Sequence, residues 1–416
     1  MRKNVWIWNH YATNTYFDKG GRHYNFAKYL KKAGYEPVVF GSNAKHGKPE
    51  TFYSNIRLWQ EHMAEEIGVP FVFVRSRTYG DNGKQRVLNM IDFYRNVKKT
   101  AKEYAALHGK PDVIYASSVH PLTLVAGIQV AKHFGVKCIC EVRDLWPESI
   151  VAFSSRFTKS NPLIRLLYRG EKWIYEKADA LIFTMEGAYD YIVDQGWEKD
   201  IPRSKVHYIN NGVDLEKFLY NQEHYQVSDA DLRNPEQFNV VYTGSIRRVD
   251  HLGMLLDAAK LVTNPRIRFL IWGDGNERGA MERRVQEEQI SNVVFKGLVE
   301  KKYIPNIVMQ SDVNLAHLEG KSLFRYGISV NKLFEYLAAE KPILFDLFAS
   351  YNPVERFQAG IVLQQQTPKT IAAAVDAMSH MSPAEIDGFC KGAKAGAEAY
   401  SFSSLTNMLI DVIEGV

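Results

Sequence analysis

One run in the second half of the chain, Ser329 to Pro342, combines the residue types that hold a nucleotide. It starts with polar residues, continues as a short helix and ends just before a buried strand. We expect Ser329 or Asn331 to cap this helix, whose free N–H groups and positive dipole end suit a diphosphate. Lys332 adds a mobile positive charge, and Glu335, one turn beyond Asn331, can accept hydrogen bonds from ribose hydroxyls. An alternative interpretation is a capped amphipathic helix that only packs on the core, so the other motifs must decide between the two interpretations.

A second group of candidates follows the strand predicted at 238–243. There Gly244, Arg247 and Arg248 stand at the carboxyl end of the strand. Fixed positive charges at such a place can stabilise a departing diphosphate, because their attraction to it increases most as its negative charge develops. Alternatively, one of the two arginines is simply solvated.

Gly20 and Gly21 lie between the first predicted strand and a helix expected to begin near Tyr24. Without a Cβ atom, their backbone can approach a ligand closely, although a flexible turn would also explain the pair. The spacing is not the Gly-x-Gly-x-x-Gly dinucleotide fingerprint, which argues against a nicotinamide enzyme.

Ionisable residues also follow two neighbouring strands of the first half. Arg143, Asp144 and Glu148 come after the strand predicted at 136–142, and His120 follows the strand before it. Asp144 can orient an acceptor or pair with Arg143. His120 is a second candidate for substrate contact, with a structural histidine as the alternative.

Short apolar runs alternate with helical stretches along the whole chain, which predicts an α/β fold of two doubly wound Rossmann-like domains facing a central cleft. We expect an N-terminal acceptor-side domain at 1–208, a C-terminal donor-binding domain at 209–398, and a terminal helix at 399–416 that packs back on the first domain. Strands are predicted at 5–9, 37–41, 69–75, 112–117, 136–142, 180–184, 205–209, 238–243, 267–272, 292–295, 312–317, 342–346 and 360–364.

The composition indicates a compact soluble protein of 416 residues with 46% apolar residues. No apolar run approaches the roughly 20 residues that span a bilayer, and the first residues lack the pattern of a signal peptide, so we expect a cytoplasmic protein. Three scattered cysteines fit a reducing compartment and argue against a structural disulfide or a zinc site.

The net charge of +5 is divided unevenly. Residues 1–208 hold 31 Lys/Arg and 21 Asp/Glu, giving +10, and the remainder holds 21 and 26, giving −5. The basic half can face an anionic acceptor or a membrane surface, or it can be a solvated face. We expect no nucleic-acid partner.

The segment from Arg156 to Lys177 carries an apolar stripe and basic groups on largely separate helical faces. Such a helix can rest on anionic lipid, as a peripheral contact with the inner face of the membrane, or it can pack on the sheet as an ordinary helix. The residues concerned are Leu163, Leu166, Leu167, Trp173 and Ile174, with Arg165, Arg169 and Lys172.

In their order along essentially the whole chain, four motifs resemble those of family 4 glycosyltransferases, which have the GT-B fold. The motifs are Asn211-Gly212-Val213-Asp214, Gly244, Gly273-Asp274-Gly275 and the run 329–342. The first half, with Gly20-Gly21-Arg22-His23 and Arg143-Asp144-Leu145-Trp146-Pro147-Glu148-Ser149, is similar to bacterial members that build O-antigen and capsule polysaccharides, including amino-sugar transferases.

The resemblance implies that Leu298 and Val299 border the nucleotide base and that Glu335 is the second glutamate of a Glu-x7-Glu motif. The chain departs from the family where that motif's first glutamate is replaced by Gly327, and where Arg143 stands in place of a histidine that contacts the donor sugar.

The resemblance further implies a retaining transfer from a nucleoside diphosphate sugar, expected to be a UDP-sugar, to a saccharide or a polyprenyl-diphosphate-linked saccharide. No metal or other cofactor is expected, because arginine, lysine and helix N-termini can neutralise the diphosphate. The one Asp-x-Asp, at Asp229 and Asp231, precedes a strand and is not at a strand end. Two alternatives stay open: an enzyme similar to UDP-N-acetylglucosamine 2-epimerase, and a non-catalytic subunit that binds a nucleotide sugar.

Overall fold

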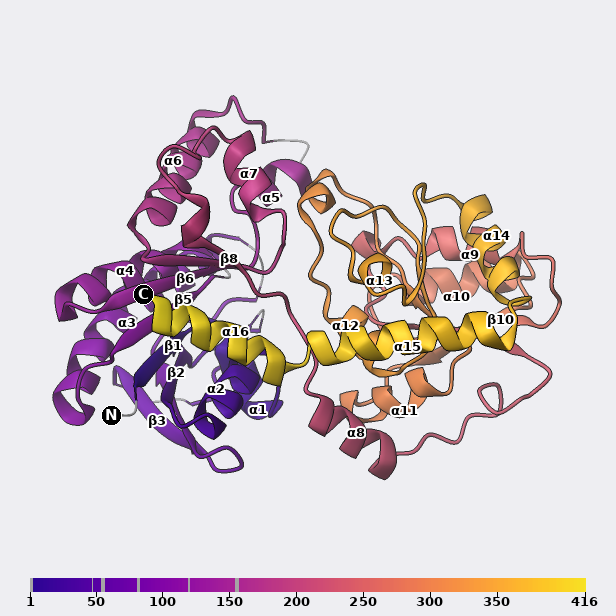
Figure 1. Cartoon of the computed structure of the whole chain (residues 1–416), viewed down its shortest axis with the longest axis horizontal. Helices are drawn as coiled ribbons and strands as arrows, with labels where there is room; N and C mark the ends of the chain where they lie inside the picture. Colours follow the sequence, from indigo (N-terminus) through magenta and orange to yellow (C-terminus); the bar gives the residue numbers. More distant parts are fainter. Residues whose placement is uncertain (1–2, 47, 54–56, 81–82, 119, 154–156) are drawn as a thin grey trace. The chain divides into compact units, whose positions relative to one another are not determined.

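The computed structural model of the chain describes residues 3–416 except 47, 54–56, 81–82, 119 and 154–156, and the chain forms two compact units (Figure 1). Unit 1 consists of Met1–Asn210 and Leu405–Val416, and unit 2 consists of Asn211–Ser404. The chain thus returns to unit 1 within its last helix, α16 (Phe402–Gly415). Within unit 1, the carboxylate of Glu414 on α16 pairs with the ammonium group of Lys3 at 2.7 Å.

Unit 1 is built on an eight-stranded sheet in the order β3-β4-β2-β1-β5-β6-β7-β8. Every neighbouring pair is parallel except β3 with β4. The strands are β1 (Asn4–Trp8), β2 (Glu36–Ser42), β3 (Trp59–Ala64), β4 (Val69–Val74), β5 (Val113–Ser117), β6 (Lys137–Val142), β7 (Ala180–Phe183) and β8 (Val206–Tyr208). Strands β1, β5 and β7 are buried throughout or nearly so, which is typical of a parallel sheet covered on both faces.

Helices connect most of these strands and form the two outer layers of unit 1. Aromatic side chains fill part of its core: the ring of Trp6 lies 5.0 Å from Phe40 and 5.7 Å from Tyr104, measured between ring centroids. The remaining helices of unit 1 are α1 (Ala12–Phe17), α2 (Arg22–Lys32), α3 (Lys84–His108), α4 (Pro121–Phe134), α5 (Glu148–Phe153), α6 (Pro162–Lys177) and α7 (Ala188–Asp194).

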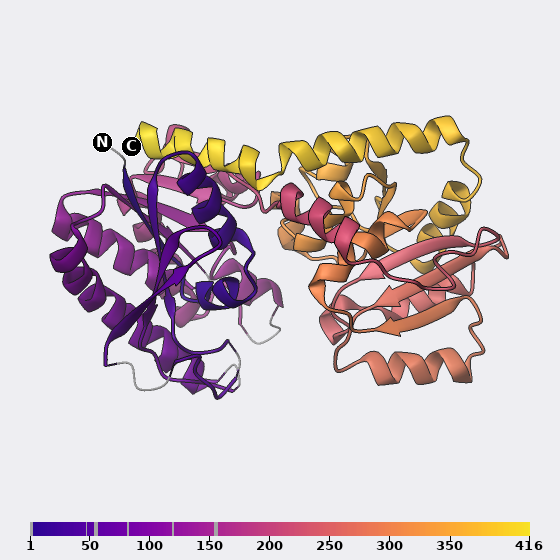
Figure 2. The same cartoon turned by 90° about the horizontal axis from the view of Figure 1, so that it is seen from below.

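Unit 2 has a six-stranded, fully parallel sheet in the order β11-β10-β9-β12-β13-β14. Figure 2 shows α10 (salmon) and α15 (yellow) on opposite sides of this sheet. The strands are β9 (Phe238–Thr243), β10 (Ile267–Trp272), β11 (Val293–Gly297), β12 (Val313–Ala316), β13 (Ile343–Phe345) and β14 (Gly360–Val362). The helices are α8 (Leu215–His224), α9 (Gly253–Ala259), α10 (Arg278–Glu287), α11 (Ile304–Met309), α12 (Asn331–Ala338), α13 (Pro353–Arg356), α14 (Pro368–Met378) and α15 (Pro383–Ala399).

The predicted fold class, two doubly wound α/β domains, is confirmed, and every predicted strand has a counterpart in the structure. Strand β3 was not among the predictions because it is a partly exposed antiparallel edge strand in which apolar residues do not alternate regularly. Among the described residues, no helix is both long and apolar enough to cross a membrane.

Candidate functional site

A glycine, a histidine and an aspartate follow three neighbouring strands of unit 2 where those strands end. Gly244 follows β9, His317 follows β12 and Asp346 follows β13. Because parallel strands end at the same edge of a sheet, these residues and the following loops gather where doubly wound folds bind ligands. The side chain of Lys332, from α12, reaches into this group and donates a hydrogen bond to the carbonyl oxygen of His317 at 3.3 Å.

The ammonium group of Lys332 is enclosed by the strand ends. Its Nζ atom lies 4.0 Å from the ring centroid of Tyr242 and 3.0 Å from the point that a Cβ atom on Gly244 would occupy. A side chain at position 244 would therefore crowd this charge. Burial lowers the pKa of Lys332 to about 8, although the carboxylates of Asp250 and Asp346 act against that shift.

The first turn of α12 differs from the prediction that Ser329 or Asn331 caps it. The capping position is held by Val330, which has no side-chain acceptor, because Asn331 is already the first helical residue and Ser329 lies one residue too early. The hydroxyl of Ser329 is buried and has no hydrogen-bond partner among the described residues. Among the described residues no side chain caps this turn; the N–H of Leu333 donates to the carbonyl oxygen of Val330 at 3.2 Å, and the N–H groups of Asn331 and Lys332 can bind an anion.

Glu335 lies one turn further along α12. Burial raises the pKa of its carboxyl group, and the nearby ammonium of Lys301, 3.8 Å away, opposes this effect. Leu298 and Val299 follow the end of β11, and Leu298 is 73% exposed, as a residue that borders a flat base would be. The ribose and base contacts of these residues stay predictions.

The two candidate arginines after β9 differ in their contacts. Arg247 is 60% exposed in its side chain, and its Nε atom lies 3.3 Å from the carboxylate of Asp250, which also accepts hydrogen bonds from the backbone N–H of Arg247 and the hydroxyl of Ser245. Arg248 is exposed and forms no ion pair among the described residues. Asp250 therefore holds the loop, and Arg248 is the more accessible of the two charges for a ligand, although it also acts on the carboxylate of Glu319.

Sequence reasoning missed the buried pair of His317 and Asp346. The Nδ1 atom of His317 is hydrogen-bonded to the carboxylate of Asp346, and both side chains are fully buried. The second carboxylate oxygen accepts a hydrogen bond from Gln366 at 3.1 Å. A histidine and an aspartate directly after two apolar strands were the available signal. The pair supports the carbonyl group that holds Lys332.

Gly273 and Gly275 have a structural role in this edge. A Cβ atom on Gly273 would lie 1.7 Å from the carbonyl oxygen of Gly244, and one on Gly275 would lie 2.2 Å from that of Ile246. The loop after β10 thus packs directly against the loop after β9. Asp274 accepts a hydrogen bond from the backbone N–H of Gly275 at 2.9 Å, which stabilises the turn after β10.

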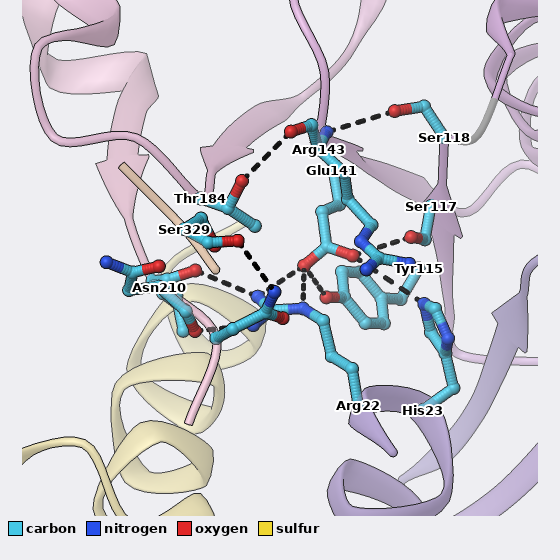
Figure 3. Close-up of polar contacts among 12 residues, drawn as sticks. Arg22, His23, Tyr115, Ser117, Ser118, Glu141, Arg143, Thr184, Asn210 and Ser329 are labelled. Carbon is cyan, nitrogen blue, oxygen red and sulfur yellow. Dashed lines mark hydrogen bonds and ion pairs between the residues drawn. The ribbon is translucent and has the colours of Figure 1, made fainter. Parts of the chain in front are cut away.

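Unit 1 contains a second polar network, centred on the fully buried carboxylate of Glu141 in β6 (Figure 3). Arg22, the first residue of α2, donates to it from Nε at 2.7 Å, and the hydroxyls of Tyr115 and Ser117 also donate to it. Burial alone would raise the pKa of Glu141, but the charge and hydrogen bonds of Arg22, together with the His23 ring 3.6 Å away, hold that pKa well below its usual value.

The same arginine fixes two further parts of unit 1. Arg22 donates to the carbonyl oxygens of Ile209, at 2.9 Å, and Asn210, just after β8. It also follows Gly20 and Gly21 directly. Gly21 has a φ of 89°, and a Cβ atom there would press on Thr15 at 3.2 Å, so the glycine is needed for this turn. Neither Arg22 nor Glu141 was predicted as a site residue. The signal available in the sequence was a lone glutamate within an apolar strand.

The other predicted residues of unit 1 have mixed surroundings. His120 is buried and shares a 2.7 Å hydrogen bond with His10, and burial, together with the charge of Arg86, lowers its pKa to about 3. The suggested pairing of Arg143 with Asp144 is wrong, since no ion pair joins them; Asp144 is exposed, and the Nε atom of Arg143 is buried without a partner. Their contacts with an acceptor stay predictions.

Glu148 begins α5 and is linked to neighbouring elements of unit 1. Its carboxylate accepts a hydrogen bond from the hydroxyl of Tyr168 and pairs with Lys159 at 2.8 Å. Glu148 thus links α5 to α6 through Tyr168. Its predicted acceptor contact would have to compete with these partners.

The Asp-x-Asp sequence binds a lysine in this structure. The carboxylates of Asp229 and Asp231 lie 2.7 Å and 2.5 Å from the ammonium group of Lys296 on β11. In the part of the chain that the structure describes, no group of three His, Cys, Asp or Glu residues has an arrangement that could hold a metal ion.

Sequence profiles of two families match the chain. Glycosyltransferase Family 4 matches residues 22–217, and Glycosyl transferases group 1 matches residues 237–380. Among curated sequences, the probable glycosyltransferase WbjE of Pseudomonas aeruginosa is 27% identical over 242 residues, which is 56% of each chain. The putative teichuronic acid biosynthesis glycosyltransferase TuaH of Bacillus subtilis is 26% identical over 208 residues, 50% of this chain and 49% of TuaH. The chain therefore spans about half the length of the curated relatives it matches.

Solved structures share the fold over the whole chain. Sucrose-phosphate synthase of Thermosynechococcus elongatus superposes with a TM-score of 0.70 and 18% identity, covering 100% of this chain and 99% of the synthase. HepE of Anabaena in complex with UDP-glucose superposes with a TM-score of 0.66 and 12% identity, covering 100% of both chains. The two profile matches, the two relatives and the shared fold together show a chain with the GT-B fold, in which residues 22–217 match Glycosyltransferase Family 4 and residues 237–380 match Glycosyl transferases group 1.

Proposed function

We propose that this protein is a retaining glycosyltransferase that moves a sugar from a UDP-sugar to a hydroxyl group of a saccharide or a polyprenyl-diphosphate-linked saccharide, during synthesis of a surface polysaccharide. The two glycosyltransferase family matches support the transferase activity. The name of TuaH, a teichuronic acid glycosyltransferase, supports the polysaccharide role, and the UDP-glucose complex of HepE supports the donor.

The observation that carries the proposal is the meeting of three features at one sheet edge of unit 2. The ammonium group of Lys332 lies against Gly244, beside strand ends, and the first turn of α12 has no side-chain cap. Together they offer a positive charge and N–H donors to a diphosphate. These groups interact most strongly with the leaving diphosphate as its charge increases, which lowers the barrier to breaking the bond between sugar and phosphate.

Retention follows if the acceptor hydroxyl attacks the anomeric carbon on the face that the diphosphate leaves. In this step the anomeric carbon exchanges its bond to the phosphate oxygen for a bond to the acceptor oxygen, and the hydroxyl proton passes to the departing phosphate. Lys332 and the first turn of α12 would stabilise the diphosphate during this exchange. We propose that no metal ion is needed, so a chelator should leave the rate unchanged.

We further propose that unit 1 binds peripherally to the inner face of the membrane through α6. Leu163 and Leu166 are 55% and 60% exposed and Trp173 is 38% exposed, whereas Ile174 is buried against the unit. Arg165 and Arg169 are exposed beside this stripe. Exposed apolar and basic groups on one helix suit the interface of an anionic bilayer.

Two parts of the predicted helix do not contribute to this surface. Lys172 pairs with Asp200 at 2.6 Å, and Arg156 lies outside the described residues. The double variant Arg165→Gln/Arg169→Gln should therefore bind less to phosphatidylglycerol vesicles in sedimentation and lose activity only on membrane-bound acceptor. An equal loss on soluble acceptor would contradict the membrane contact.

The donor assignment is tested by thermal unfolding with UDP, GDP, ADP and dTDP, because a ligand that binds only the folded chain raises its melting temperature. Selective stabilisation by UDP is expected, followed by turnover of a UDP-sugar only when an acceptor is present. Turnover without acceptor would favour an epimerase-like enzyme. Binding without any turnover would favour a nucleotide-sugar-binding subunit, and no response to any nucleotide would refute the donor site.

A further inference from the structure

A basic cleft lies at the carboxyl ends of β2 and β4 in unit 1, apart from every residue assigned to the donor. It has a volume of about 980 Å³. Strand β2 ends at Ser42 and β4 ends at Val74, so the cleft opens at the sheet edge where doubly wound folds bind ligands. Its lining residues are mostly polar or basic and include Asn43, Arg57, Arg75, Ser76, Arg77, Asp92, Asn96 and Lys99.

The cleft carries more positive charge than its own carboxylate can neutralise. Arg77 is bound by Asp92, whose carboxylate accepts from its Nε at 2.6 Å and from its Nη2 at 3.2 Å. Arg57, Arg75 and Lys99 are exposed and form no ion pair among the described residues. Four cations and one carboxylate leave a formal charge of +3, which is more than enough to balance a diphosphate that is esterified at both ends.

The backbone that carries the arginines is held in place by buried or half-buried amide side chains. The side-chain oxygen of Asn43 accepts from the N–H of Ser76 at 2.8 Å. Asn96 donates to the carbonyl oxygen of Arg75 at 2.7 Å, and the fully buried Asn89 donates to that of Arg77. Three asparagines from two other elements thus fix the segment after β4, which pre-organises the cleft for a ligand.

We propose that this cleft binds the phosphoryl group of the acceptor, as a sugar diphosphate or phosphate ester, through Arg57, Arg75 and Lys99. The inference rests on the proposed function, because it assigns the anionic part of the acceptor to unit 1. Guanidinium groups bind phosphate oxygens in pairs, and an excess of positive charge in a concave site attracts a multivalent anion from solution. An ordinary solvated basic face would need neither the cleft nor the asparagine supports.

Binding is tested by isothermal titration of the full chain with inorganic pyrophosphate, in saturating UDP so that the donor site is occupied. Arg75→Gln/Lys99→Gln is compared with Arg95→Gln/Lys102→Gln, which removes the same charge from exposed positions of α3 outside the cleft. The first variant should bind pyrophosphate about tenfold or more weakly, and the second within about twofold of the unchanged chain, because direct contacts outweigh net charge. No pyrophosphate binding, or equal weakening in both variants, would overturn the proposal.

The source of the phosphoryl group is tested by transfer to one saccharide in three forms: linked to a short polyprenyl diphosphate, as a soluble sugar phosphate, and without phosphate. The KM of Arg75→Gln/Lys99→Gln should rise about tenfold more for a phosphorylated form than for the form without phosphate, and the form most affected identifies the natural acceptor. An equal rise on all three would overturn the proposal.

The two proposals fail in different ways. If UDP does not stabilise the chain, the donor site is wrong, and the titration with pyrophosphate is then made on Lys332→Met, in which the donor charge is absent. Binding that persists there and disappears with Arg75→Gln/Lys99→Gln supports the cleft on its own. If UDP binds but pyrophosphate does not, only the cleft proposal falls.

Discussion

Replacing Arg22 by methionine should destabilise unit 1 strongly, because it leaves a buried charge without its partner. The side chains of Arg22 and Glu141 are 3% and 0% exposed, and removing one member of such a pair costs about 3–5 kcal/mol. The carbonyl oxygens of Ile209 and Asn210 also lose their guanidinium donor, which places the expected loss in the upper part of this range.

The pH dependence follows from the carboxyl group of Glu141. In the unchanged chain its pKa is below the usual value of about 4.3, so its contribution to stability is present above that pH and is lost as the pH falls below it. Without Arg22, burial should raise this pKa above the unfolded value, so the folded variant then holds the extra proton and loses stability as the pH rises. The difference in unfolding free energy between the two chains should therefore be larger at pH 7.5 than at pH 4.5.

Urea unfolding followed by tryptophan fluorescence is a suitable assay, because six of the seven tryptophans lie in unit 1. The double variant Arg22→Met/Glu141→Gln should recover most of the lost stability, since no charge is then buried alone. As a control, Lys137→Met removes a partly exposed partner of Asp179 and should cost at most about 1 kcal/mol. A loss under about 1 kcal/mol in Arg22→Met, or one that does not change with pH, would refute this reasoning.

Three further predictions concern unit 2. Lys332→Met should reduce turnover about 100-fold, while the exposed control Lys369→Met should not. The affinity of the unchanged chain for UDP should also fall as the pH rises through about 8, because the ammonium group of Lys332 then loses its proton. A flat pH profile measured by titration calorimetry would contradict the role of Lys332. Glu335→Ala should weaken donor binding and turnover together, and unchanged donor kinetics would remove it from the site. Gly273→Ala should lower the melting temperature and abolish UDP stabilisation, because its Cβ would overlap the carbonyl oxygen of Gly244; a variant with an unchanged melting temperature would show that the two loops are not packed this closely.

Local patterns were sufficient for the strands other than β3 and for the helix that carries Lys332 and Glu335. Each buried strand is a short apolar run, and a residue that follows such a run must lie at the carboxyl edge of a parallel sheet. Gly244 and Lys332 could thus be chosen from the sequence. The capping of α12 was predicted wrongly because a shift of one residue changes which side chain can reach the free N–H groups.

The contacts that join distant residues could not be predicted in the same way. Arg22 and Glu141 are 119 positions apart, and only the order of the strands, β2-β1-β5-β6, decides that α2 reaches β6. The cleft beside Arg75 likewise depends on β4 lying next to β2 and on amide groups from α3, none of which has a local signature.

The sequence by itself determined the alternation of strands and helices, the two-domain α/β class and the residue types available at strand ends, because these depend on neighbours within a few positions. Tertiary structure alone decided which of those residues meet. It placed the ammonium of Lys332 against Gly244, paired His317 with Asp346, and left Arg57, Arg75 and Lys99 exposed, with no ion pair to another residue that the structure describes. The physical reason is that parallel strands are joined through long crossovers, so residues far apart in the chain share one edge, and their burial and charge arise only there.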